Sequence, residues 1–246
     1  MQNDPLQLPL PFRHQPHFDA RDFVAAESNR EALVWLEAAP MAARWPEGRL
    51  ALFGPAGCGK SHLLHIWAER SGAVLLSGPA VTDLADVPPD GLLAVDDTDA
   101  VGDETLLLHL LNTARDRGLR LLLSGRAAPS RWPVGLPDLS SRLRAITAVE
   151  IREPEDELLA ALLMRLLADR QLAVTEAVQA WLLLRLPRSA AALREAVVRL
   201  DRESLASGTA ITRALAARVL EDLAVAEPDE VSPTGSVPSS PGHGFL

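Results

Sequence analysis

The clearest chemistry in this sequence of 246 residues lies in one segment, GPAGCGKS, at residues 54–61. Its spacing fits the phosphate-binding pattern G-x-x-x-x-G-K-[ST]. Glycines permit a tight concave loop whose backbone N–H groups point at phosphate oxygens. Lys60 is then expected to neutralise β- and γ-phosphates, and the Ser61 hydroxyl to ligate Mg²⁺. The alternative is a glycine-rich turn that matches by coincidence, and the lysine–serine pair and both flanking segments argue against it.

A phosphate loop needs a strand before it and a helix after it, because the helix N-terminus adds partial positive charge. Residues 49–53 (RLALF) form a short apolar run that predicts a strand. Residues 61–70 have helical periodicity, with Leu63, Leu64 and Trp67 on one face. The residues expected to contact a bound nucleotide are Gly54, Pro55, Ala56, Gly57, Cys58, Gly59, Lys60, Ser61 and His62.

A second segment supplies acids. Residues 92–95 are apolar and are followed by Asp96 and Asp97, which predicts a buried strand that delivers carboxylates to its carboxyl end. After a phosphate loop, Asp96 is expected to hold Mg²⁺ through water and Asp97 to orient the attacking water. The next apolar run, 119–123, ends at Ser124. Ser124 either touches the terminal phosphate or is an ordinary strand end.

The order of the elements predicts the fold. Strand patterns at 49–53, 73–76, 92–97, 119–123 and 146–151 alternate with helical patterns at 28–39, 61–70, 103–117 and 139–143. This alternation predicts an α/β, doubly wound parallel sheet. From residue 153 only helical patterns follow, ending near 171, 186, 207 and 225. We therefore expect a base at 18–152, a helical lid at 153–225, a flexible leader at 1–17 and a disordered tail at 226–246.

Composition narrows the class of protein. The net charge is −9, so broad nucleic-acid binding is not expected and any DNA contact is local or made through a partner. The single cysteine, Cys58, fits a reducing cytoplasm. It is either a redox-sensitive group or simply a small residue of the loop. No secretory signal and no run of membrane-spanning length is found. The oligomeric state is left open, with a homo-oligomer among the alternatives.

The leader contains one exposed apolar segment. It is either a solvated polyproline-like arm or a docking peptide, because apolar side chains on a disordered arm are typical of segments that insert into a partner. If it is a docking peptide, the residues that contact the partner are Gln7, Leu8, Pro9, Leu10, Pro11 and Phe12.

The order of these motifs resembles the AAA+ ATPase family, over about residues 18–225. GKSHLLHIWA at 59–68, the Asp96–Asp97 pair and LPDLSSRL at 136–143 are similar to motifs of its DnaA branch. The resemblance implies bound ADP or ATP with Mg²⁺. It also implies that Arg142 is an arginine finger, which reaches the nucleotide of a neighbouring subunit. Phe23 and Val24 match a segment that lines the adenine, or they are plain core residues.

Three features depart from DnaA itself. The helical part is followed by a tail and not by a basic helix-turn-helix domain, so direct sequence-specific DNA binding is not expected. QLPLPF resembles the hexapeptide by which proteins dock on the DNA polymerase sliding clamp. Together these features imply a cytoplasmic negative regulator, associated with the nucleoid through the clamp, that stimulates hydrolysis of DnaA-bound ATP. Ala191 stands where the family carries its "sensor 2" arginine, which leaves this chain's own ATP hydrolysis open.

Arg188 and Arg194 lie three residues to either side of Ala191 on roughly the same helix face. One alternative is that Arg188 or Arg194 takes the place of the missing arginine. The other is that the contact with the phosphates is absent and both arginines are solvated. Rival functions are another AAA+ replication partner, such as a helicase loader or clamp-loader-like subunit, a P-loop kinase acting on a small molecule, and a clamp-binding scaffold with a vestigial nucleotide site.

Overall fold

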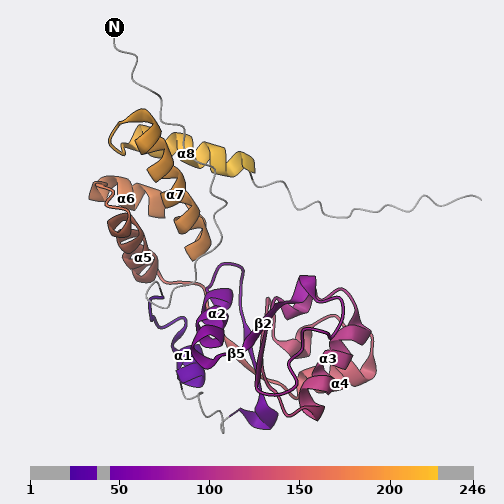
Figure 1. Ribbon diagram of the computed structural model, residues 1–246. Helices are drawn as coiled ribbons and strands as arrows, with labels where there is room; N and C mark the ends of the chain where they lie inside the picture. The colour runs from indigo at the N-terminus through magenta and orange to yellow at the C-terminus, as the bar shows by residue number, and fades with distance from the viewer. Residues whose placement is uncertain (1–22, 38–44, 227–246) are drawn as a thin grey trace, which may run out of the picture.

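The computed structural model describes residues 23–37 and 45–226, and Figure 1 shows its arrangement. Five strands form one parallel sheet in the order β2–β3–β4–β1–β5. They are β1 (Arg49–Phe53), β2 (Val74–Ser77), β3 (Leu92–Asp96), β4 (Arg120–Gly125) and β5 (Thr147–Glu150). The predicted α/β class with a parallel sheet is confirmed.

Helices cover both faces of the sheet because side chains alternate along each strand. Leu50 and Leu52 of β1 pack in one buried cluster with α1 (Arg30–Glu37) and α2 (Lys60–Ser71). Ala51 packs in the opposite cluster with α3 (Glu104–Asp116) and α4 (Pro137–Arg144). Short 3₁₀ turns complete the connections: η2 (Pro46–Gly48), η3 (Gly78–Ala80), η4 (Thr98–Ala100) and η5 (Pro129–Arg131).

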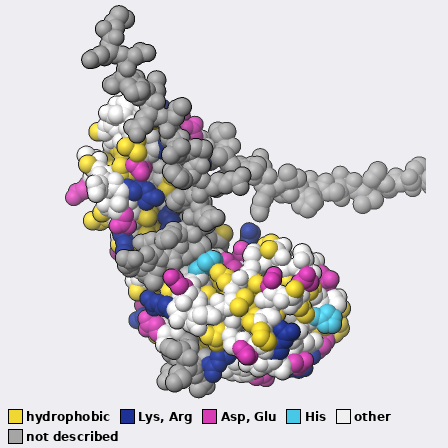
Figure 2. Space-filling model, in the orientation of Figure 1, with side chains coloured by type: hydrophobic (Ala, Val, Ile, Leu, Met, Phe, Trp, Pro, Cys, Tyr) yellow, Lys and Arg dark blue, Asp and Glu magenta, His cyan; other side chains and the backbone are white. Residues whose placement is uncertain are grey.

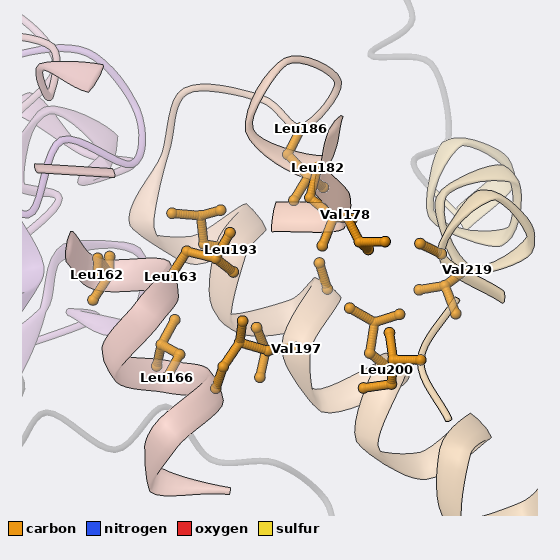
Figure 3. Close-up of a cluster of buried hydrophobic side chains, with 14 of the residues drawn as sticks. Leu162, Leu163, Leu166, Val178, Leu182, Leu186, Leu193, Val197, Leu200 and Val219 are labelled. Atoms are coloured by element: carbon orange, nitrogen blue, oxygen red, sulfur yellow. The ribbon is translucent and has the colours of Figure 1, made fainter. Parts of the chain in front are cut away.

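Four helices follow the sheet and lie at one end of it (Figure 1): α5 (Asp156–Asp169), α6 (Glu176–Leu183), α7 (Ala190–Ser207) and α8 (Arg213–Ala226). They form the lid and share a leucine-rich core of their own. In Figure 3, Leu163 and Leu166 of α5 approach Leu193 and Val197 of α7. A separate core lets the lid hold its shape while its position on the sheet depends on a few contacts.

Two expected elements differ in detail. β2 begins at Val74 and is an edge strand: among the described residues only β3 pairs with it, and Val74 is 37% exposed. The first helix begins at Arg30 and not at residue 28, and the side chains of the two residues before it bond outside the helix. Ser28 Oγ donates to Glu155, whereas the Asn29 side chain bonds Ala26 N–H and the Val24 carbonyl.

The leader with its segment at 7–12, and the tail from 227, lie outside the described residues. Within the part of the chain that is described, no helix is long and apolar enough to cross a membrane. Figure 2 shows acidic and basic side chains interspersed over the visible face of the sheet region. A continuous basic surface of the kind that tracks a DNA backbone is not seen on this face.

Candidate functional site

The phosphate loop connects β1 to α2 as predicted. Gly59 precedes α2 in the left-handed conformation, with φ 106°, which few residues other than glycine adopt. Lys60 is 6% exposed, and its Nζ donates to the carbonyls of Gly54 at 2.9 Å and Pro55 at 2.8 Å. The ammonium group thus lies inside the curve of the loop, where it can neutralise a phosphate.

The lid touches this loop directly. Ala190 N–H, at the start of α7, donates to the Gly57 carbonyl at 3.4 Å. Gly57 has φ 75°, and a Cβ at this position would lie 2.3 Å from Ser189 Cβ, so no larger residue fits. Ser189 caps α7 by accepting from Ala192 N–H at 3.1 Å. The N-termini of both α2 and α7 therefore lie at the loop, and their dipoles favour an anion there.

A pocket beside the loop joins the base to the lid. The Phe23 and His62 rings meet edge to face, with centroids 5.5 Å apart. Phe23 and Val24 were predicted either to line the adenine or to be plain core residues. Both line a pocket between the phosphate loop and the lid. The pocket is lined by Phe23, Val24, Asn29, Gly57, Cys58, Gly59, His62, Pro154, Leu158, Leu159, Leu162, Ala190 and Arg194.

The arginines near Ala191 have distinct partners. Arg188 forms an ion pair with Asp156 and donates to the Pro154 carbonyl, so it binds the connection between sheet and lid. Arg194 Nη2 lies 2.9 Å from His62 Nδ1. Of the alternatives left open by the sequence, solvation of both arginines is wrong, because Arg194 reaches the pocket beside the phosphate loop.

The acidic pair is organised by Ser124. This side chain is fully buried; its hydroxyl donates to Asp96 Oδ1 at 2.5 Å and accepts from Asp97 N–H at 2.8 Å. Ser124 therefore fixes the orientation of Asp96 and is more than an ordinary strand end. Its predicted contact with a terminal phosphate remains a prediction.

Asp97 has an unusual backbone conformation and a carboxyl group with a shifted pKa. Its φ is 48°, a left-handed conformation that aspartate tolerates better than most residues. Desolvation raises the pKa of its carboxyl, and the neighbouring carboxylates of Asp96 and Asp99 raise it further. A carboxylate that is costly to ionise gains from a nearby cation.

The residues present fit Mg²⁺ only together with a nucleotide. Among the described residues, no group of three or more His, Cys, Asp or Glu side chains forms a metal site. Mg²⁺ characteristically takes one or two protein ligands and completes its shell with waters and phosphate oxygens. Asp96 and the hydroxyl of Ser61 would supply the protein ligands and the phosphates the remainder.

Arg142 lies near the end of the sheet at which the strands begin, opposite the end that carries the phosphate loop. It occupies the last turn of α4, and β5 begins shortly afterwards beside the start of β1. The phosphate loop follows the far end of β1, about 15 Å away along a five-residue strand. Arg142 Nε and Nη2 donate to Asp138 Oδ2 at 3.3 and 3.2 Å. This arginine is therefore bound to its own helix and is separated from the loop of its own chain by about the length of β1.

The start of α4 is anchored by an acid on α3. The Glu104 carboxylate accepts from Gly135 N–H, at 2.8 and 2.9 Å from its two oxygens, and from Leu136 N–H at 2.9 Å. Leu139 and Leu143 of α4 are buried in the core between α3 and the sheet. The helix that carries Arg142 is thus held by the two residues just before it and along its inner face.

No family model and no curated protein matches this sequence. Among solved structures, domain III of DnaA from Thermotoga maritima matches with a TM-score of 0.67 and 18% identity, covering 85% of this chain and 97% of that one. AMPPCP-bound DnaA from Aquifex aeolicus matches with a TM-score of 0.61 and 18% identity, covering 79% and 68%. A variant of Thermotoga maritima RuvB matches with a TM-score of 0.64 and 19% identity, covering 84% and 72%. At these identities the likeness shows the fold alone, a parallel α/β base followed by a group of helices.

Proposed function

We propose that this chain is a negative regulator of replication initiation that resembles Hda, the regulatory inactivator of DnaA. In this proposal, residues 7–12 dock on the DNA polymerase sliding clamp and Arg142 acts on ATP held by DnaA. The observation that supports it best is the separation of Arg142 from the chain's own phosphate loop by the length of β1. An arginine so placed serves a nucleotide bound to another molecule.

The chain's own nucleotide would have a structural role. The loop, both helix N-termini and Lys60 form a site for the phosphates of ADP or ATP, and the pocket of Phe23 and His62 lies beside it for the base. Because α7 contacts the loop through Ala190 and Gly57, a bound nucleotide would bridge base and lid. Nucleotide binding would therefore hold the two parts in one relative position.

The action on DnaA would be electrostatic. Charge builds up on the phosphoryl oxygens as ATP is hydrolysed, and a guanidinium supplied by a partner stabilises it, typically accelerating hydrolysis by ~10³–10⁵. Docking on a clamp loaded on DNA raises the local concentration of the partner by tethering. The acidic net charge of −9 is no obstacle, because the clamp encircles the DNA.

The test is hydrolysis of DnaA-bound ATP in the presence of clamp-loaded DNA. The full chain should accelerate hydrolysis, whereas a chain lacking residues 1–13 should bind ADP normally and fail to accelerate it. Acceleration that is equal with and without the clamp, or undiminished by the deletion, would contradict the clamp-docking part. A small-molecule kinase would instead transfer phosphate to an acceptor with DnaA and clamp omitted.

A further inference from the structure

A cavity lies between α1 and α2, on the side of the sheet opposite α3 and α4; the two helices are side by side in Figure 1. Its volume is about 210 Å³. Apolar side chains from both helices line it: Leu33, Leu36, Leu63, Ile66 and Trp67. Two exposed charged residues, Glu37 and Arg70, also line it. Its described lining residues all differ from those of the pocket beside the phosphate loop, so it is a separate site.

The volume of this cavity suits an aromatic side chain. An apolar cavity of ~150 Å³ lined by leucine, isoleucine and phenylalanine binds benzene, so this one has room for a phenyl ring and part of a neighbouring side chain. Trp67 adds an aromatic surface to the lining, and aromatic-lined grooves bind proline-rich segments in the extended polyproline form. The chemistry of the cavity therefore favours a proline-rich segment that carries a phenylalanine.

The leader of this chain contains a segment with that chemistry, QLPLPF at residues 7–12. It lies outside the described residues, whose first range begins at Phe23. The Phe23 ring meets the ring of His62 on α2, and the next residue of α2, Leu63, lines the cavity. The described chain thus begins beside the same end of α2 at which the cavity begins.

Residues 13–22 are long enough to bring Phe12 to the cavity. Phe12 precedes Phe23 by eleven residues, which span up to ~36 Å when fully extended. The lining residues of α2 extend from Leu63 to Ser71, about 12 Å at the rise of an α-helix. A short tether holds its end at an effective concentration in the mM range, so a weak apolar contact is enough to keep the segment in the cavity.

We propose that residues 7–12 dock in this cavity of their own chain, with the Phe12 ring between α1 and α2. Docking there removes apolar side chains of the leader from water. A second part of the inference rests on the proposed function: the proposed contact with the sliding clamp uses the same residues, so the segment occupies either the cavity or the clamp.

The test is a disulfide between the leader and the cavity, formed by mild oxidation of the full chain with bound ADP. Cys58→Ala first removes the single natural cysteine. One variant then adds Arg13→Cys, next to Phe12, and Arg70→Cys at the cavity. The matched control pairs Arg13→Cys with Glu69→Cys, because Glu69 is exposed on the same helix and does not line the cavity. Equal ADP affinities show that the variants are folded alike.

The Arg70 pair should link within one chain about tenfold faster than the Glu69 pair, because docking holds the leader at the cavity. Phe12→Ala should remove this difference, since it removes the side chain that fills the cavity. Leu6→Ala, just outside the segment, should preserve it. An excess of sliding clamp should slow the link, because the clamp competes for residues 7–12.

Equal linking rates for the two pairs, or a difference that survives Phe12→Ala, would overturn the inference. Links formed only between two chains would overturn it as well, because the occupant would then be the leader of a second copy. Failure of the proposed function is distinguishable, since the Arg70 pair would then link fast whether or not the clamp is present. Conversely, equal rates together with clamp binding that Phe12→Ala abolishes would rule out docking in the cavity and leave the proposed function in place.

Discussion

Arg194 on α7 lies with its Nη2 2.9 Å from Nδ1 of His62 on α2. An arginine carries only donors, so His62 Nδ1 must accept and the ring proton lies on Nε2. The pair joins the lid to the helix that follows the phosphate loop. It places a lid cation beside the candidate nucleotide pocket although Ala191 occupies the position at which the resemblance in sequence predicted an arginine.

We predict that Arg194→Ala weakens ADP binding about tenfold, because a charge-assisted contact at the pocket is lost. Arg202→Ala is the control, since Arg202 lies on the same helix but is exposed and does not line the pocket. Titration calorimetry with ADP measures both. Equal affinities for the two variants would show that Arg194 serves the fold and not the nucleotide.

Gly57 provides a test of the contact between loop and lid. Gly57→Ala places a methyl group against Ser189, whereas Gly72→Ala adds one where nothing lies within 4 Å. Both glycines have φ near 70°, so both variants should lose about 1 kcal/mol of stability to backbone strain.

Only Gly57→Ala should also lose nucleotide affinity, because it must displace the start of α7 from the loop. Unfolding in urea and ADP titration separate the two effects. If the two variants lose affinity to the same extent, contact of the lid with the loop is not needed for binding.

Ser124→Ala should be destabilising beyond the loss of one hydroxyl. The substitution leaves Asp97 N–H without its acceptor and Asp96 without its donor, at a cost of about 1–3 kcal/mol. Urea unfolding measures the loss, and Ser141→Ala, at an exposed position of α4, is a control that should cost far less. A wild-type midpoint for Ser124→Ala would mean that the acidic pair is held by other contacts.

Asp97→Asn should stabilise the fold at pH 7. Because the folded-state pKa of Asp97 is raised, the folded protein binds this proton more tightly than the unfolded chain, and ionisation costs stability as the pH rises. Asparagine removes that cost and tolerates the left-handed conformation. We expect a gain of roughly 0.5 kcal/mol after allowing for solvent screening.

The gain should disappear as the pH falls into the range where wild-type Asp97 is protonated. Unfolding free energies of both proteins between pH 3 and pH 7 measure it. A gain of equal size at both ends of the range would show that it does not arise from the Asp97 charge.

The sequence alone was sufficient to predict the elements whose local patterns are strong. The phosphate loop, the Asp96 strand and the helix of Arg142 were all found, because each combines an apolar period with a diagnostic polar residue. The edge position of β2 was missed, since strand order is a tertiary property. The contact between Arg194 and His62, which are 132 residues apart, could not be predicted from the sequence, because it depends on how the lid packs on the base.

The central claim is tested most directly by single-turnover hydrolysis of ATP bound to DnaA, with clamp-loaded DNA and an excess of this protein. Arg142→Ala should lower the accelerated rate by about 10³ or more while its ADP affinity and clamp binding stay at wild-type values. Arg144→Ala, which removes the neighbouring arginine held by Ser140 on the same helix, should keep most of the acceleration. Hydrolysis that is as fast with Arg142→Ala as with the wild-type chain would contradict the account.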